Sequence, residues 1–133
     1  MGIGEARTHG DGTDLTIVTF GNGVYMSLRV AARLATRGVG VRVVDMRWVV
    51  PLPVHDIMRE ANATGRVLVV DETRRSGGVG EGVVAELVDA GFSGRIGRVT
   101  SVDSFVPLGD AARLVLVSEA DIEAAAERLL APG

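Results

Sequence analysis

The residue types best suited to chemistry are concentrated in one stretch in the middle of the chain. Two adjacent carboxylates and two arginines come first, and three glycines follow within a few residues: Asp71, Glu72, Arg74, Arg75, Gly77, Gly78 and Gly80. Where such glycines open a helix, the unpaired N–H groups and the positive end of the helix dipole suit an anion, and the arginines add positive charge. This stretch therefore predicts an anion or partner site. A tight strand-to-helix turn with solvated arginines is the alternative.

Asp71 and Glu72 could also act as an acid–base pair, as in a hydrolase. Carboxylates at the end of a buried strand more often cap a helix or pair with an arginine such as Arg74, and we favour that role. The serines of the chain lack the nucleophile-elbow pattern, so a Ser-His-Asp set built on His55 would rest on composition alone. His55 follows the first residues of a predicted helix, where a surface histidine is the ordinary interpretation.

Composition narrows the classes of protein. The chain has 133 residues, of which 47% are hydrophobic, enough for the core of one domain, 1–133. A net charge of −3 argues against a nucleic-acid or anionic-membrane surface. The absence of cysteine excludes disulfides, thiol catalysis and cysteine-ligated metal. No targeting or membrane-length apolar segment is visible, so we expect a cytoplasmic protein.

Alternating strands and helices must position the candidate residues. Apolar, β-branched runs predict strands at 15–20, 41–44, 67–70 and 98–102, with a weak extended segment at 3–9. Apolar residues at helical spacing predict helices over 24–37, from Pro53 to about Gly65, through Val84, Leu87 and Val88, and over 119–130. A charged turn is expected after 67–70 and a loop at 92–97.

This alternation with short connections predicts parallel strands joined by right-handed crossovers, hence a three-layer α/β/α sandwich. The four consecutive apolar residues at 67–70 are typical of a strand covered on both faces. That strand is therefore central. Its carboxyl end faces the Gly-rich turn, which is where open α/β sheets usually bind ligands.

Five motifs, taken in order, resemble a known family. They are DLTIVTFGNG at 14–23, VVDMRWVVPL at 43–52, TGRVLVVDE at 64–72, GGVG at 77–80 and RVT at 98–100. Their order and spacing resemble the carboxy-terminal domain of the transketolase superfamily. The likeness is closest to the beta subunit (the decarboxylating component) of thiamine-dependent 2-oxoacid dehydrogenases, the class that includes pyruvate and branched-chain 2-oxoacid dehydrogenases. It covers residues 3–130.

The resemblance implies a five-stranded mixed sheet of order 1-3-2-4-5 with strand 1 antiparallel. The resemblance therefore implies that the weak extended segment 3–9 is an edge strand paired with 41–44. In this family the domain is the last of the chain, so residues 1–133 are expected to be a piece of a longer enzyme, either a separate beta subunit or a fused chain.

The resemblance also implies thiamine diphosphate and Mg²⁺ in the parent enzyme. Such enzymes hold the ion with Gly-Asp-Gly followed roughly 25–30 residues later by Asn, because carboxylate and amide oxygens are hard ligands. Gly10-Asp11-Gly12 matches only the first half, since 35–41 contains no Asn and neither Asn22 nor Asn62 lies at the right distance. The activating glutamate lies on another domain in the family. We therefore expect this chain to have no catalytic, cofactor-binding or metal-binding residues and to be inactive alone.

In this family the domain serves assembly. It packs on the cofactor-binding domains of the same enzyme, helps to form a dimer, and docks the dihydrolipoyl acyltransferase core through a surface that should be acidic, because that partner is basic. The loop 91–96, GFSGRI, lacks acidic residues, which counts against docking there. Trp48, Val49 and Val50 lie in a connection and predict either core packing or a subunit interface.

Two functions of different class therefore remain. The first is a non-catalytic assembly and partner-docking domain of a thiamine diphosphate-dependent 2-oxoacid dehydrogenase. The second is a regulatory small-molecule or anion-binding α/β module that uses the Gly77 to Gly80 turn. A hydrolase built on Asp71 and Glu72 is a weaker third.

Overall fold

Five strands form one mixed sheet in the order β1-β3-β2-β4-β5. Their bounds are β1 Arg7–His9, β2 Leu15–Thr19, β3 Val41–Asp45, β4 Arg66–Arg74 and β5 Arg95–Ser101. The computed structural model describes residues 6–46, 53–74, 79–101 and 119–131. Strand β1 runs antiparallel to β3, with Arg7 opposite Asp45, and the other neighbouring pairs are parallel. The predicted strand order and the antiparallel edge strand are confirmed.

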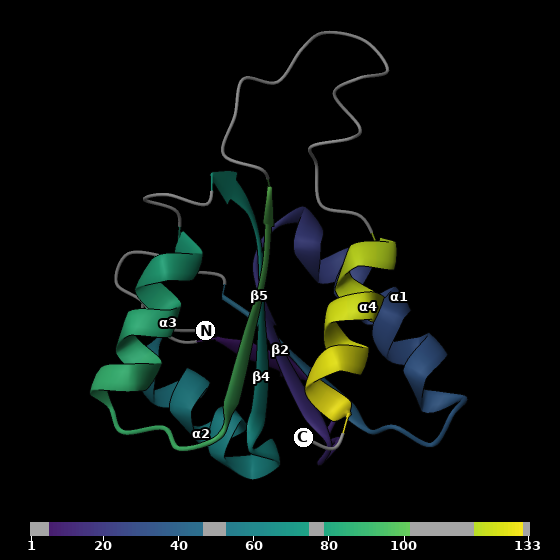
Figure 1. Ribbon diagram of the computed structural model, residues 1–133, viewed down its shortest axis with the longest axis horizontal. Coiled ribbons are helices and arrows are strands. Elements are labelled where there is room, and N and C mark those ends of the chain that lie inside the picture. The colour runs from purple at the N-terminus through teal and green to yellow at the C-terminus, as the bar shows by residue number, and fades with distance from the viewer. Residues whose placement is uncertain (1–5, 47–52, 75–78, 102–118, 132–133) are drawn as a thin grey trace, which may run out of the picture.

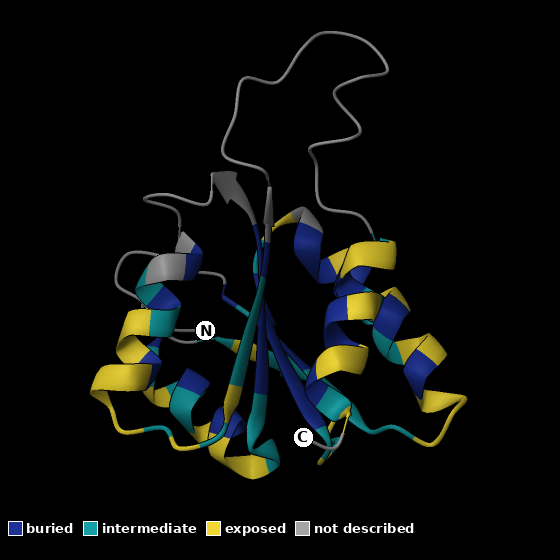
Figure 2. Cartoon of the chain, in the orientation of Figure 1, coloured by how far each residue is buried: buried dark blue, intermediate teal, exposed yellow. Residues whose placement is uncertain are grey.

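The described residues form four helices, which cover the two faces of this sheet (Figure 1). They are α1 Asn22–Ala35, α2 Val54–Thr64, α3 Val79–Asp89 and α4 Glu119–Leu130. Helices α1 and α4 pack on one face, and α2 and α3 pack on the other. The buried residues lie in the sheet and on the inner faces of the helices, while the outer faces are exposed (Figure 2). The predicted three-layer α/β/α sandwich is therefore confirmed.

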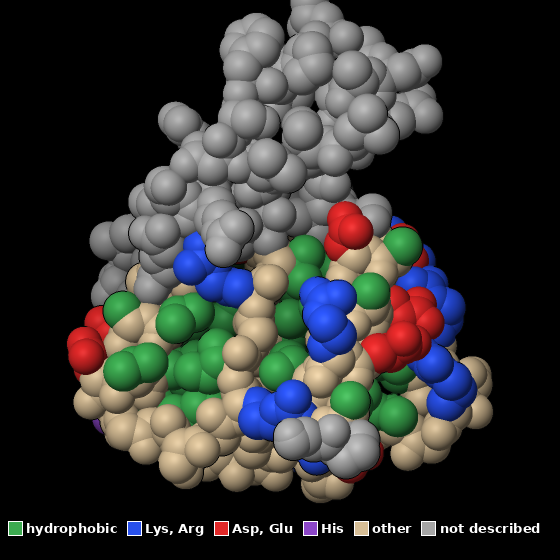
Figure 3. Space-filling view, in the orientation of Figure 1, with side chains coloured by type: hydrophobic (Ala, Val, Ile, Leu, Met, Phe, Trp, Pro, Cys, Tyr) green, Lys and Arg blue, Asp and Glu red, His purple; other side chains and the backbone are tan. Residues whose placement is uncertain are grey.

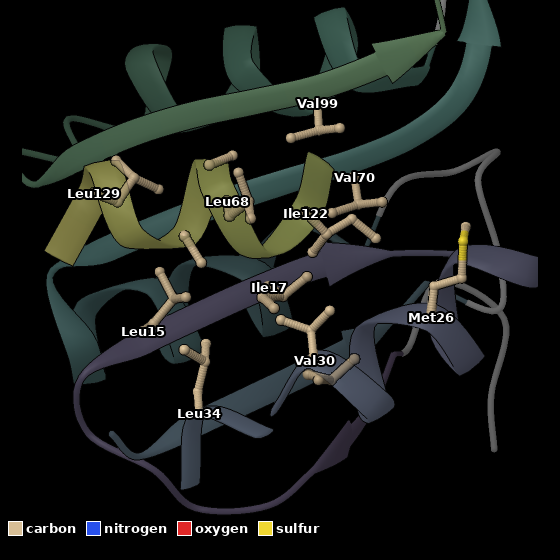
Figure 4. Packing of buried hydrophobic residues seen from close by; sticks show 13 residues of the cluster. Leu15, Ile17, Met26, Val30, Leu34, Leu68, Val70, Val99, Ile122 and Leu129 are labelled. Atoms are coloured by element: carbon tan, nitrogen blue, oxygen red, sulfur yellow. The ribbon is translucent and has the colours of Figure 1, made fainter. Parts of the chain in front are cut away.

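The sheet separates two apolar clusters because successive residues of a strand point to opposite faces. Ile17 and Leu68 lie in the cluster shared with α1 and α4 (Figure 4), and Val18 and Val69 lie in the cluster shared with α2 and α3. All of residues 67–70 are at most 1% exposed. This double burial is why the run is uniformly apolar, as expected for a central strand.

Several boundaries differ from those that the sequence predicts. Strand β4 continues to Arg74, where a turn was expected, because its pairing with β5 extends to Arg74 opposite Ser101 after a shift past Asp71. Strand β5 begins at Arg95, inside the predicted loop 92–97, because Arg95 already pairs with Arg66. Sheet pairing thus overrides the local turn signals of charge and glycine.

Helix α3 also presents a different face from the one predicted. Val83 and Leu87 are fully buried, whereas Val88 is 62% exposed, so the buried stripe includes Val83 and leaves Val88 outside. Two helix ends follow the sequence closely. Helix α2 ends at Gly65, whose φ of 74° is left-handed, and α4 spans the predicted 119–130.

Candidate functional site

The carboxyl end of β4 meets the first turn of α3 through Asp71 and Gly80. The Gly80 N–H donates a hydrogen bond to Asp71 Oδ2, and Asp71 is 1% exposed. A Cβ atom on Gly80 would lie 3.1 Å from Asp71 Oδ2 and 3.6 Å from Arg98 Nε, so glycine allows this close approach. Asp71 therefore satisfies a free N–H at the amino end of α3 and places negative charge at the positive end of its dipole.

This geometry bears on the anion site and the acid–base pair that the sequence suggested between Asp71 and Gly80. An N–H group that would bind an external anion already donates to the chain's own carboxylate, and that carboxylate serves helix capping, the role favoured over acid–base catalysis. Glu72 and Arg74 lie on β4, but their side chains are outside the described structure. Arg75, Gly77 and Gly78, like Trp48, Val49 and Val50, fall outside the described residues. The anion or partner site and the apolar interface remain predictions.

The carboxyl ends of β2 and β4 form the point where open α/β sheets most often bind ligands, because the helices that follow leave toward opposite faces. Here the first turn of α1 covers that point. A Cβ atom on Gly23 would lie 2.2 Å from Thr19 Oγ1 and 3.5 Å from Val70 Cγ1. Thr19 is fully buried, and its hydroxyl has no hydrogen-bond partner within the described structure. The packing of α1 thus leaves little room for a ligand beside Gly23.

A pocket of about 410 Å³ lies nearby, between β1, β3 and the start of α1. Its lining includes one carboxylate, one imidazole, one guanidinium and one phenol, from Asp45, His9, Arg7 and Tyr25. Tyr25 is 64% exposed, so the pocket opens at the surface. The sequence missed it because only the antiparallel pairing of β1 brings Arg7 opposite Asp45. These groups suit polar contacts with a ligand or another protein surface.

The turn Gly10-Asp11-Gly12 does not fit a thiamine diphosphate and Mg²⁺ site. It connects β1 to β2 at the amino end of β2, and Arg42 donates hydrogen bonds to the carbonyls of Asp11 and Gly12 at 3.1 and 2.6 Å. Nor do the described residues contain any group of three or more His, Cys, Asp or Glu side chains that could hold a metal ion. The turn serves packing against β3. None of the helices described is long and apolar enough to cross a membrane.

The fold defines a class: an α/β/α domain with one antiparallel edge strand, in which Asp71 and Gly80 join the central strand to the start of a helix. The chain belongs to the family described as "Transketolase, C-terminal domain", which matches residues 4–128.

Relatives similar to this chain include beta subunits of pyruvate dehydrogenase. The "Pyruvate dehydrogenase E1 component subunit beta" of Staphylococcus aureus (strain Mu50) is 37% identical over 123 residues, covering 90% of this chain and 38% of the relative. The subunit of the same name from Bacillus subtilis (strain 168) is 34% identical over 131 residues, covering 96% and 40%. The chain thus spans about two fifths of the length of these relatives.

Solved structures share the fold. A chain described as "Split gene transketolase, inactive beta4 tetramer" superposes with a TM-score of 0.86 at 27% identity, over 98% of this chain and 42% of that one. A 2-oxoglutarate:ferredoxin oxidoreductase from Magnetococcus marinus gives a TM-score of 0.66 at 16% identity, over 96% of this chain and 20% of that one. The second likeness shows the fold alone.

Proposed function

We propose that this chain is the non-catalytic assembly and partner-docking domain of a thiamine diphosphate-dependent 2-oxoacid dehydrogenase. One observation carries the proposal. Pyruvate dehydrogenase beta subunits match 90–96% of this chain, yet the chain covers only 38–40% of them. The remainder of the enzyme would supply the thiamine diphosphate and Mg²⁺ sites and carry out the oxidative decarboxylation.

The contacts of the described residues support a structural role. The buried carboxylate of Asp71 caps α3, and the Gly10-Asp11-Gly12 turn packs against β3. Tyr25 on α1 and Val88 on α3 expose 64% and 62% of their surface, and the proposed partners would cover such side chains. The proposed partners are the cofactor-binding domains of the same enzyme, a second copy of the chain and a dihydrolipoyl acyltransferase core. A cytoplasmic location remains an expectation.

A domain exchange tests the proposal. The matching carboxy-terminal segment of the Staphylococcus aureus beta subunit is replaced by this chain, and the chimera is expressed with its alpha subunit. We expect co-purification of the two subunits and measurable decarboxylation of pyruvate. The control chimera carries an unrelated α/β domain of similar length and should give neither.

Sedimentation velocity of the isolated chain, over a concentration series, supplies an independent readout. Self-association, or binding of the beta-subunit segment that lacks this domain, supports an assembly role, because apolar surface normally covered is then free to associate. A strict monomer that neither binds that segment nor restores subunit co-purification would overturn the proposal.

A further inference from the structure

Strand β5 forms one edge of the sheet, and two different surfaces flank it. Among the described strands it pairs only with β4, so the N–H and C=O groups along its outer side have no partner in this sheet. In Figure 3 this edge faces the viewer, with apolar side chains on the α3 side and basic side chains gathered around it. An edge of this kind can accept an added strand.

The α3 side of the edge is apolar. Val84, Phe92 and Ile96 are partly buried, and they pack on the cluster under α2 and α3. With Val88, which is 62% exposed, they form what we call the apolar strip. Figure 3 shows apolar side chains on this side of the edge. It offers apolar side chains of an added strand a surface to cover.

The α4 side of the edge is basic. A groove of about 280 Å³ lies between β5 and α4, and its lining includes Arg95 and Arg128 but no acidic residue. Arg98 also borders the groove, but its Nε lies toward Gly80 of α3. Gly97 brings the helix close, because a Cβ atom there would lie 3.0 Å from Leu129 Cδ1. We call this the arginine groove.

Arg95 also fixes the groove in place. Its Nη1 donates hydrogen bonds to the carbonyl oxygens of Leu129 and Ala131 at 2.8 and 2.6 Å, which satisfies carbonyls at the end of α4. The side chain of Arg128 has no ion-pair partner within the described structure. The groove is therefore a rigid surface with positive charge still available.

We propose that the β5 edge docks an extended, acidic segment of a partner protein, which adds to the sheet as a further strand. Alternate side chains of a strand point to opposite faces, so acidic residues would enter the arginine groove while apolar residues cover the apolar strip. The inference rests on the assembly function proposed above and names the surface and the charge of one partner. It also reverses the expectation of an acidic docking surface for this part of the domain.

Charge decides between this occupant and a second copy of the chain. Pairing of β5 with its own copy about a two-fold axis perpendicular to the sheet would bring the arginine groove of one chain, with Arg95 and Arg128, alongside the same groove of the other. Like charges facing each other across a strand pair are destabilising. An acidic segment is attracted by the same residues.

The test uses the full chain and two synthetic peptides labelled with fluorescein, a Val-Glu and a Val-Lys alternating octamer. Fluorescence anisotropy should give a Kd for the Val-Glu peptide at least about tenfold lower, and this affinity should fall as salt is raised, because exposed charges are screened. Amide hydrogen exchange in β5 should slow when the Val-Glu peptide is added. Equal affinity for both peptides, or no binding of either, would overturn the proposal.

Substitutions locate the site. Arg128→Glu should weaken Val-Glu binding about tenfold, and Arg128→Gln should weaken it less while avoiding an acid at a helix carboxyl end. Arg7→Glu, on the edge strand β1 at the far side of the sheet, makes the same charge change and should leave binding unchanged. Equal losses in Arg128→Glu and Arg7→Glu would contradict docking at β5.

The two proposals fail separately. A chimera that assembles, together with a peptide whose binding ignores Arg128→Glu, overturns the docking edge alone. A chimera that does not assemble, together with a peptide that binds at β5, overturns the proposed enzyme context alone.

Discussion

Arg33 on α1 bridges two carboxylates on α4. Its Nη1 donates to Glu119 Oε1 at 2.9 Å, and its Nε donates to Glu123 Oε1 at 2.8 Å. Arg29 and Arg37, one turn away on either side, extend these contacts into a ladder that ends at Glu127. Arginines and glutamates each recur every four residues, which places Arg29 and Arg33 on one face of α1, with Arg37 in the turn that follows, and the three glutamates on one face of α4. The ladder therefore fixes how α1 and α4 lie beside each other.

The ladder predicts a loss of stability in acid. Hydrogen bonds from Arg29 and then Arg33 hold the pKa of Glu119 below its ordinary value of 4.5. A carboxylate with a depressed pKa in the folded state stabilises the fold above its unfolded pKa, and that contribution is lost as the pH falls through the folded pKa. The urea midpoint of Glu119→Gln should lie below the unsubstituted midpoint at about pH 7, with the difference narrowing by about pH 3.

A matched control is Glu86→Gln, on the exposed side of α3. It makes the same charge change away from the ladder and should show no such difference at either pH. A Glu119→Gln difference that stays constant across this pH range would show that Glu119 does not stabilise the fold through its ionised form. High salt should reduce the difference at neutral pH, because the arginines of the ladder are half exposed.

We expect Glu60 on α2 to contribute more to the stability of the fold than Glu119 of the ladder does. Although only 6% exposed, it accepts hydrogen bonds from Arg42 Nη1 at 2.9 Å and Arg59 Nε at 2.7 Å. Glu60→Ala would leave the nearly buried guanidinium of Arg42 without its counter-charge, so we expect a loss of about 3 kcal/mol in the free energy of unfolding. Arg59→Ala, whose side chain is 62% exposed, should cost under about 1 kcal/mol. Similar losses from both, measured by urea denaturation, would refute this ranking.

The cap of α3 by Asp71 can be tested by removing its acceptor. Asp71→Ala leaves the Gly80 N–H without this partner, and we expect a loss of about 2 kcal/mol with faster amide exchange at Gly80. Asp71→Asn keeps an oxygen acceptor and should lose less. If both variants were equally destabilised, the negative charge rather than the hydrogen bond would be the stabilising feature.

Gly12 is predicted to be a steric requirement. A Cβ atom there would lie 2.2 Å from both Gly40 C and Val41 N, which are backbone atoms that cannot rotate away. Gly12→Ala should therefore cost about 2–3 kcal/mol of stability. Gly65→Ala is the comparison, because Gly65 has left-handed backbone angles of φ 74° and ψ 2° but no atom within 4 Å of the added Cβ, so only backbone strain of about 1 kcal/mol is expected. Thermal unfolding should rank the two in that order.

Part of the fold could be predicted from local pattern alone. The apolar stripe of 119–130 and the glycine after Thr64 correctly indicated α4 and the end of α2, because helix periodicity and left-handed caps are local properties. The uniform burial of 67–70 also followed from composition. The antiparallel edge pairing of β1 did not: the residues indicated only a weak extended segment at 3–9, and its place in the sheet came from the family resemblance.

The anion or partner site stays a prediction. Of its glycines, only Gly80 lies in the described structure, and its N–H donates to Asp71. Sequence could suggest a cap, but not which N–H group would receive it. The arginine groove was missed altogether, because Arg95 and Arg128 are 33 residues apart in the chain and meet only where α4 returns to β5.

The sequence by itself determined the alternation of strands and helices and which of them are buried. Both follow from the types and spacing of residues that are close together in the chain. Only the tertiary structure decided which side chains face one another. Arg33 and Glu123 are separated by 90 residues, and their contact depends on how two helices are rotated on a shared sheet. The relative rotation of α1 and α4 cannot be predicted from a local pattern, since it is set by the packing of both helices against the same strands.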